Sequence, residues 1–562
     1  MDLLFPSQDH DMEPLLPQSN RGELEILAFD LVRESAQLGV RLNEHSRNAI
    51  GNLLRYVNSY YTNLIEGHAT LPADIERVYR ADYSIDPQKR SLQLEAKAHV
   101  EVERGMRARL RSNKAGQPNI FSKEFLQGLH TRFFRHMPEA YRTIKIPGKS
   151  DHVVIPGEFR SWDVEVGIHA PPTHASVEAF LERFFTFYGS PALSPAQRII
   201  AIPAAHHRLL WIHPFPDGNG RVARLFTEAC LIHMKLDSFG IWSVFRGLAR
   251  SADPSYKQLL AAADDKRQGS TDGRGPLSDQ SLSHFCRFFM ETALDQIKFI
   301  EGLLEVPGLL GRVSDFAERG VSAGNLPKAT GPLLEKLIIH GRLKRGDALR
   351  ILSPVERTAR NHLSKLLDLE LVAADRLRHR ADIVWRIPTT AGHAYFPNIY
   401  PATDREETPL LERGEPSMVS YLRSLSDDSL NRVLEEILVA SLHGIDNEES
   451  VSGAIAMTNA SGFDVDDVQF EIDDIDLFDD DQARMDFRFH MTGEHDWESD
   501  KMYSGHEIAG SATLVIEADE HTFLENVKAY RVEYPDENEG VSLELDGEDR
   551  DETSGMGNDS RI

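Results

Sequence analysis

The segment 212–224, IHPFPDGNGRVAR, constrains the chain most, because it places a dense group of polar residues between two apolar stretches. RIIAIPAAHHRLLW precedes it and LFTEACLIHM follows it, and both carry apolar residues at helical spacing. The segment is therefore expected to be a loop that leads into a helix, with its polar groups held at one place by two buried flanks.

The middle of this segment has the composition of an anion site. Gly218, Asn219 and Gly220 can bend the backbone tightly and direct several N–H groups to one point. A helix that begins near Arg221 would add the positive end of its dipole. Arg221 and Arg224 are three residues apart and would both project near the first turn. Together these parts predict a polyphosphate site.

Two further residues of the segment suggest chemistry at that site. Asp217 stands beside the glycines and is placed to hold a magnesium ion that bridges phosphates. His213 lies four residues earlier, and the role that remains for it is a base that takes a proton from an attacking hydroxyl. A lone histidine or a Gly-Asn-Gly turn is usually structural, so the prediction rests on the combination at fixed spacing.

The stretch HPFPDGNGRVAR resembles the signature of the Fic family, H-P-F-x-[D/E]-G-N-G-R-x-x-R, at every specified position, and a weaker resemblance extends from about Pro14 to Leu304. Fic proteins are mostly α-helical and commonly transfer AMP from ATP-Mg to a hydroxyl on a target protein. The resemblance implies the following roles: His213 as base, Phe215 as core anchor, Asp217 as the magnesium ligand, Gly218, Asn219 and Gly220 as anion hole, and Arg221 and Arg224 as holders of the outer phosphates. Doc-type kinases of the family carry lysine where this chain has Gly220, so the resemblance favours a nucleotidyl transferase.

Two other segments resemble parts of the family's site. EVGIHAPP looks like the flap that clamps the target segment and covers the nucleotide, which implies such contacts for Val166, Gly167, Ile168 and His169. PSYKQLLAAAD resembles the segment that lines the adenine, where two adjacent tyrosines are often found. Here the pair is Ser255 and Tyr256, so Tyr256 is the candidate contact, with a packing aromatic as the alternative.

The segment TNLIEG resembles the inhibitory motif [S/T]-x-x-x-E-[G/N], with Thr62, Glu66 and Gly67 at the specified positions. Thr62 and Glu66 are one helical turn apart, and Gly67 is a good C-terminal stop. The resemblance implies that Glu66 pairs with Arg224 and denies it to the γ-phosphate, as in the class with an N-terminal inhibitory helix. A solvent-facing glutamate is the structural alternative. In a third reading Glu66 aligns a water for removal of AMP.

At 562 residues the chain is too long for one core, and its patterns predict a mainly α chain of several domains. The expected parts are an N-terminal helical region with the inhibitory helix (1–110), an all-helical Fic core with a β-hairpin flap (111–304), a linker (305–325), a winged helix-turn-helix (326–401), an acidic α+β or mostly β domain (404–534) and a disordered tail (535–562).

The winged helix-turn-helix is expected from three helical patterns followed by an alternating hairpin, with Val355 to Leu367 as recognition helix. Its basic residues are Arg357, Arg360, Lys365, Arg376, Arg378 and Arg380. DNA contact and protein docking remain equal alternatives. A nucleotide-sensing DNA-binding regulator is accordingly the competing hypothesis for the whole chain.

Charge and composition limit the classes of partner that this chain is expected to bind. Lys and Arg number 62 against 89 Asp and Glu, and the net charge of −27 argues against non-specific nucleic-acid binding by the whole chain. The chain lacks a secretory pattern and an apolar run near membrane length, which predicts a cytoplasmic protein without membrane contact. Cys230 and Cys286 are expected to be buried thiols. The expected partners are ATP, Mg²⁺ and a target protein with a Ser, Thr or Tyr hydroxyl, the chain itself being one candidate.

Overall fold

The computed structural model of this chain describes residues 5–79, 83–111, 118–135, 137–145, 151–167, 169–252, 255–374 and 382–401, and beyond these mainly 427–442, 462–463, 469–477, 483–494, 507–516 and 522–532. The chain divides into two compact units. One is Met1–Ser441 with Glu471–Phe487 and Thr513–Glu525, and the other is Leu442–Phe470 with Arg488–Ala512 and Asn526–Ile562. Most described residues are helical, which confirms the expected mainly α class.

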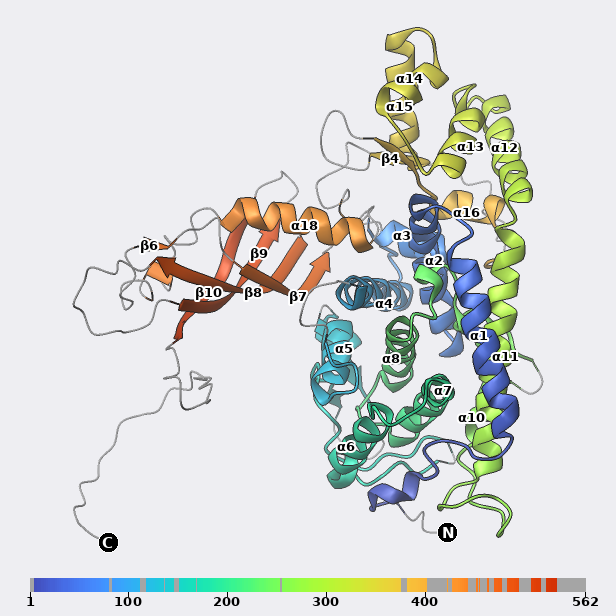
Figure 1. Ribbon diagram of the computed structural model, residues 1–562, viewed down its shortest axis with the longest axis vertical. Coiled ribbons are helices and arrows are strands. Elements are labelled where there is room, and N and C mark those ends of the chain that lie inside the picture. Colours follow the sequence, from blue (N-terminus) through green and yellow to red (C-terminus); the bar gives the residue numbers. More distant parts are fainter. Residues whose placement is uncertain are drawn as a thin grey trace. The chain divides into compact units, whose positions relative to one another are not determined.

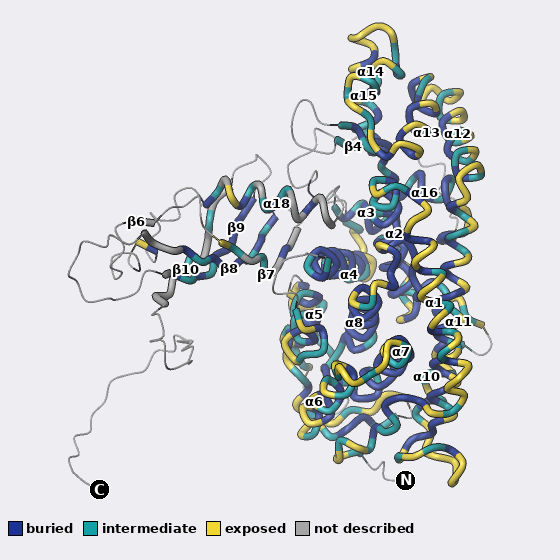
Figure 2. Tube along the Cα trace, viewed as in Figure 1, coloured by how far each residue is buried: buried dark blue, intermediate teal, exposed yellow. Residues whose placement is uncertain are grey.

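The described residues between 21 and 303 form α-helices α1 to α11, and the signature segment connects α7 to α8 (Figure 1). They are α1 (Arg21–Gly39), α2 (Glu44–Ile65), α3 (Pro72–Val78), α4 (Pro87–Arg111), α5 (Lys123–Arg135), α6 (Val177–Tyr188), α7 (Pro195–Ile212), α8 (Asn219–His233), α9 (Val244–Arg250), α10 (Tyr256–Ala262) and α11 (Asp279–Leu303). Helix α8 packs against α7, α4 and α5, and it is buried along nearly its whole length (Figure 2). Cys230 on α8 and Cys286 on α11 are buried free thiols, as expected.

Helix α2 shows why the amphipathic pattern at its centre folds as it does. The Asn43 side chain caps its first turn by accepting a hydrogen bond from the N–H of Ser46, at 2.9 Å. The apolar residues at helical spacing along α2, namely Ile50, Leu53, Leu54, Val57 and Tyr61, are all buried. Since α2 packs against α4 and α9, the end of α2 is held at a fixed place.

The segment expected to be a linker, 305–325, contains a helix. Helix α12 (Val306–Ser322) carries a proline in its first turn, where a proline costs the helix no hydrogen bond. Leu309, Val313 and Ala317 follow at steps of four and are buried, so this face packs on the neighbouring helices. Apolar residues at this spacing outweigh the three glycines within the helix, Gly308, Gly311 and Gly320.

Residues 330–401 form a helical layer with a small antiparallel sheet. The elements are α13 (Thr330–His340), β3 (Arg342–Leu343), α14 (Arg345–Leu352), α15 (Glu356–Asp368), β4 (Val372–Ala374), β5 (Ile383–Trp385) and α16 (Thr389–Tyr395). The sheet has the order β3-β5-β4, with Val372 opposite Trp385. The helix expected over Val355 to Leu367 is present as α15 and begins one residue later than expected. Residues 375–381, which include Arg376, Arg378 and Arg380, lie outside the described residues.

The acidic region contains a helix and antiparallel strands in the described residues. Helix α18 spans Asp427–Leu442, and the strands are β6 (Gly462–Phe463), β7 (Gln469–Leu477), β8 (Ala483–Glu494), β9 (Glu507–Ile516) and β10 (Thr522–Val532). The strand order is β10-β9-β8-β6, and β7 also pairs with β8. The expected tail, 535–562, lies outside the described residues. Within the described part of the chain, every helix is too short or too polar to cross a bilayer.

Candidate functional site

The signature segment is a loop between two buried helices, as predicted. Helix α7 ends at Ile212, and His213 follows in the left-handed region with φ 49°. Helix α8 begins at Asn219, two residues earlier than expected, with Gly218 as its N-cap at φ 77°. A Cβ at Gly218 would lie 2.7 Å from the Phe134 ring, so glycine is required there both by its backbone conformation and by space.

Asn219 closes this loop with its side chain. Its Oδ1 accepts a hydrogen bond from the N–H of Phe215 at 2.9 Å, and its Nδ2 donates to the Phe215 carbonyl at 2.8 Å. The Phe215 ring is fully buried and stacks on His130, with ring centroids 4.0 Å apart. Phe215 is therefore placed as a core anchor, and the amide of Asn219 fixes the loop from which its neighbours project.

The carboxylate of Glu66 lies against the first turn of α8. Val222 donates to the Gly218 carbonyl, so the N–H groups of residues 219–221 precede the hydrogen-bonded part of the helix. Glu66 Oε1 lies only 2.2 Å from where a Cβ of Gly220 would stand, and 2.5 Å from Nη2 of Arg224. An anionic group thus lies at the helix N-terminus, against one of the two signature arginines.

The electrostatics of this pair keep Glu66 ionised. Burial by itself would raise the pKa of Glu66, but the charge of Arg224 and its hydrogen bond lower that pKa to about 2, with smaller contributions from Arg221 and Lys257. The Arg224 side chain is 2% exposed, whereas that of Glu66 is 33% exposed. Thr62, one turn before Glu66, is fully buried, and its hydroxyl has no hydrogen-bond partner among the described residues.

The second signature arginine is also paired, which the sequence did not predict. Nη2 of Arg221 donates to Oε2 of Glu95 on α4 at 2.8 Å, and the Arg221 guanidinium lies 5.3 Å from the Phe133 ring centroid. His68 contacts the same carboxylate oxygen through Nδ1, at 3.1 Å. Among the described residues, both arginines expected to hold phosphates therefore face a carboxylate.

His213 has the properties of a neutral base. Burial lowers the pKa of His213 to about 4, and the charges of Arg160 and His169 act in the same direction. The ring also makes a hydrogen bond to the backbone of Leu210. A neutral imidazole that donates one N–H to a carbonyl keeps its other nitrogen as a proton acceptor, as a general base requires.

Arg160 holds the loop around His213, and sequence reasoning missed it. Its Nε donates to the His213 carbonyl at 2.8 Å and its Nη1 to the Trp162 carbonyl at 3.1 Å, while its Nη2 donates to the Pro172 carbonyl. The residue is 3% exposed. Its backbone N–H also donates to the Pro214 carbonyl at 2.9 Å. Arg160 therefore connects the start of the signature loop to the segment that precedes the expected flap.

The expected flap is a tight antiparallel turn next to α7. Strands β1 (Thr143–Ile144) and β2 (His152–Val153) pair as a short hairpin, and a separate bridge joins Val166 to His169. Gly167 lies in this turn at φ 62°, and His169 donates from Nε2 to the Trp211 carbonyl at 2.8 Å. Ile168 lies outside the described residues. This hydrogen bond attaches the turn to the backbone of α7, two residues before His213.

Tyr256 lies inside a directional hydrogen-bond chain. Thr227 donates to the Ala223 carbonyl at 2.8 Å, which leaves its oxygen to accept from Nδ1 of His206 at 2.7 Å. Nε2 of His206 then accepts from the Tyr256 hydroxyl at 2.8 Å. Burial raises the pKa of Tyr256, and the nearby Arg224 acts in the opposite direction. At 4% exposure the Tyr256 ring is packed among these groups.

Asp217 is the acidic residue of the loop, and its Oδ1 accepts from the N–H of Gly218 at 2.7 Å. The described residues contain no cluster of three or more His, Cys, Asp or Glu side chains able to hold a metal alone. Mg²⁺ bound through one carboxylate, with substrate phosphates and water as its other ligands, needs no such cluster. The donor set therefore fits a magnesium ion that arrives with a phosphate ligand.

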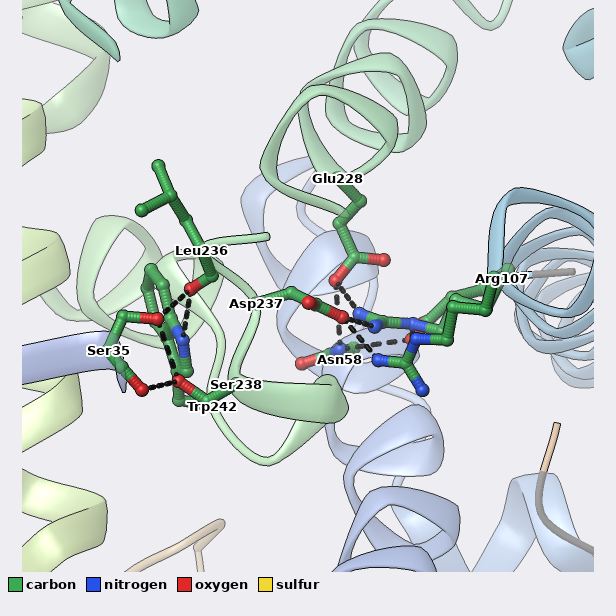
Figure 3. Close-up of polar contacts among 10 residues, drawn as sticks. Ser35, Asn58, Arg107, Glu228, Leu236, Asp237, Ser238 and Trp242 are labelled. Atoms are coloured by element: carbon green, nitrogen blue, oxygen red, sulfur yellow. Dashed lines mark hydrogen bonds and ion pairs between the residues drawn. The ribbon is translucent and has the colours of Figure 1, made fainter. Parts of the chain in front are cut away.

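A buried ionic network fixes the far end of α8 to α2 and α4 (Figure 3). Arg107 on α4 contacts Glu228 on α8 at 2.6 Å and Asp237 at 2.8 Å. It also contacts Glu103 at 2.9 Å, and Asn58 on α2 donates to that carboxylate at 3.3 Å. Because removal of one member would leave buried charges unpaired, this network keeps the three helices of the site together.

Part of this chain is similar in sequence to known proteins. Residues 120–231 match the sequence profile of the Fic/DOC family. The proteins named protein adenylyltransferase Fic from Drosophila erecta and Drosophila melanogaster are each 38% identical to this chain over 76 residues, which cover 14% of this chain. The matched segment spans 15% of the length of these curated relatives.

Solved structures of Fic proteins also resemble this chain. A Fic family protein from Desulfovibrio desulfuricans G20 is 16% identical, with a TM-score of 0.36, over 64% of this chain and 95% of its own. Residues 134–508 of Fic-1 from C. elegans are 15% identical, with a TM-score of 0.37, over 51% of this chain and 74% of that one.

Proposed function

The chain carries a Fic/DOC domain, and on that premise we propose that it is a self-inhibited protein adenylyltransferase. It transfers AMP from ATP-Mg to the hydroxyl of a Ser, Thr or Tyr side chain on a target protein. The observation that carries this proposal is the contact of Glu66 with Arg224 at the start of α8. A carboxylate bound where N–H groups, a helix dipole and guanidinium groups converge occupies an anion site that a phosphate would use.

The reaction requires a base at one side of that anion site. The target hydroxyl oxygen attacks the α-phosphorus and forms a new P–O bond, while the bond to the β-phosphate breaks and pyrophosphate leaves. His213 takes the hydroxyl proton, because its low pKa leaves it neutral at physiological pH. Arg160 keeps the His213 loop in place through the loop carbonyls, so the base is already positioned when the substrates arrive.

The remaining residues of the signature bind and orient ATP. Arg221 and Arg224 hold the outer phosphates, which leaves the α-phosphate near the base. Asp217 would hold Mg²⁺, which when bound neutralises phosphate charge and stabilises the departing pyrophosphate. The turn around Gly167 and His169 would align the target segment, and Tyr256 would lie near the adenine once Arg224 turns to the phosphates.

The test uses ATP labelled at different phosphates. The Glu66→Gly protein is incubated with cell lysate and magnesium, together with ATP that carries the label on either the α- or the γ-phosphate. Protein bands, which can include the chain itself, should acquire the α-label and not the γ-label, and the modified residue should be Ser, Thr or Tyr by mass spectrometry. Transfer of the γ-label would instead identify a kinase.

A second candidate function is supported by the exposed face of α15. Its exposed residues are Glu356, Arg357, Thr358, Arg360, Asn361 and Ser364, and Glu356 is the one acid among them. Arginine, threonine, asparagine and serine are the side chains that contact phosphates and base edges in a winged helix-turn-helix. This favours a DNA-binding regulator, whose activity the nucleotide site would control.

Binding of duplex DNA by the full chain separates the two functions. The affinity should fall as salt rises, and the double change Arg357→Ala with Arg360→Ala should abolish it. Arg33→Ala with Arg287→Ala, two exposed arginines on α1 and α11, is the matched control and should leave the affinity unchanged. If the wild-type chain shows no salt-sensitive binding, the exposed face of α15 docks protein and not DNA.

A further inference from the structure

The pairing of Arg221 is as complete as that of Arg224. The Arg221 and Glu95 side chains are 8% and 13% exposed, and they meet at 2.8 Å across the α4–α8 interface. Glu95 is 126 residues from Arg221 in the chain and belongs to no part of the inhibitory motif. The site therefore contains two arginine–carboxylate pairs, only one of which includes Glu66.

Both pairs are connected to the end of α2. Helix α2 ends in a Schellman motif, because the N–H of His68 donates to the Asn63 carbonyl at 2.9 Å and that of Gly67 to the Leu64 carbonyl at 3.0 Å. Gly67 has φ 90°, which only glycine adopts without strain. The same turn thus presents Glu66 to Arg224 and, two residues later, His68 to Glu95.

This arrangement neutralises the positive charge that a polyphosphate needs. ATP-Mg brings several negative charges, and the arginines at the start of α8 can attract them fully only when no carboxylate offsets them. Removal of Glu66 frees Arg224 alone. Glu95 remains against Arg221, in a partly buried place where solvent screens the charge poorly.

We propose that Glu95, held by His68, is a second inhibitory carboxylate that competes with the phosphates of ATP for Arg221. Opening the site to ATP then takes two separable steps. Glu66 must leave Arg224, and Glu95 must leave Arg221. The inference rests on the proposed function, since it assigns the regulation of the same nucleotide site. The opposite assignment is that Glu95 orients Arg221 for the phosphates, in which case its loss weakens nucleotide binding.

Nucleotide affinity in an activated background separates these assignments. ATP-Mg binding is measured by calorimetry on the Glu66→Gly protein and on the same protein with Glu95→Gln, which removes the charge and keeps the size of the side chain. The affinity should rise about tenfold, a change that corresponds to roughly 1.4 kcal/mol. Glu95→Asp, which keeps the charge, should give a smaller rise. The control Glu291→Gln removes an exposed carboxylate paired with Arg287 on α11 and should have no effect.

A further variant guards against a folding defect at the buried position. His68→Ala alters a side chain that is 35% exposed and should loosen Glu95 without unfolding the protein, so the affinity should rise by less than in Glu95→Gln. Unchanged or weaker affinity in both variants would overturn the role of Glu95. Tighter ATP binding without any AMP transfer would contradict the proposed function and leave this inference standing, whereas absence of ATP binding in every variant would contradict both.

Discussion

The carboxylate of Glu66 occupies the space that a side chain at Gly220 would need. A Cβ at Gly220 would lie 2.2 Å from Oε1 of Glu66 and 3.1 Å from Nη1 of Arg224. The second glycine of the signature therefore lets an anion approach the first turn of α8 closely, whether that anion is the glutamate or a phosphate.

Gly220→Ala should accordingly differ from Glu66→Gly in its effect on ATP affinity, although both variants remove the contact between Glu66 and Arg224. The new methyl group displaces Glu66 but also blocks the phosphate, so the double variant Gly220→Ala with Glu66→Gly should bind ATP at least about tenfold more weakly than Glu66→Gly alone. Titration calorimetry measures the difference. Equal affinities would mean that no phosphate comes close to Gly220.

The pKa of His213 predicts the acid limb of the pH profile. Burial and the charge of Arg160 lower this pKa to about 4, and Glu66 is a carboxylate that raises it slightly. The neutral form of the base therefore persists well below the usual histidine value of 6.5, and loss of Glu66 lowers the pKa further. For the Glu66→Gly protein, kcat/KM should stay flat from about pH 8 to about pH 5 and fall only at lower pH. A midpoint near 6.5 would contradict this placement of the base.

Arg160→Lys tests whether the loop must be held by a planar guanidinium. Lysine keeps the charge but cannot reproduce the bonds to the His213, Trp162 and Pro172 carbonyls. In the Glu66→Gly background, the rate of AMP transfer should fall at least about tenfold, while ATP affinity changes less than about threefold. Arg198→Lys is the matched control, since Arg198 also bonds carbonyls next to α7 but is exposed. Equal losses in the two variants would argue against a special role for Arg160.

The sequence predicted the parts of the site that lie close together in the chain. The apolar period of 222–229 and the polar loop before it indicated a helix with a charged start, and α8 begins within two residues of that prediction. Gly67 is likewise the stop of helix α2. These features are local, because helical periodicity and helix termini depend on neighbours within a few residues.

The partners that come from distant segments could not be predicted in this way. Glu95 and Arg160 stand in stretches without any pattern that marks them, and they join the site only when α4 and the segment before the flap pack beside α7 and α8. The segment 305–325, expected to be a linker, contains helix α12, whose residues Leu309, Val313 and Ala317 are buried. Tertiary packing brings Glu95 and Arg160 to the site, and local preference does not indicate it.

The rate of AMP transfer by Glu66→Gly, compared with wild type and with Glu66→Gly plus Arg224→Ala, tests the central claim most directly. The pair of Glu66 and Arg224 lies at 2.5 Å with Arg224 almost fully buried, so its removal should raise the rate by about 10- to 100-fold, a change that roughly 1.4 to 2.7 kcal/mol would produce. The double variant should lose most of this gain, because the freed guanidinium is gone. Equal rates in wild type and Glu66→Gly would contradict self-inhibition, and a gain that survives in the double variant would show that Glu66 acts through a group other than Arg224.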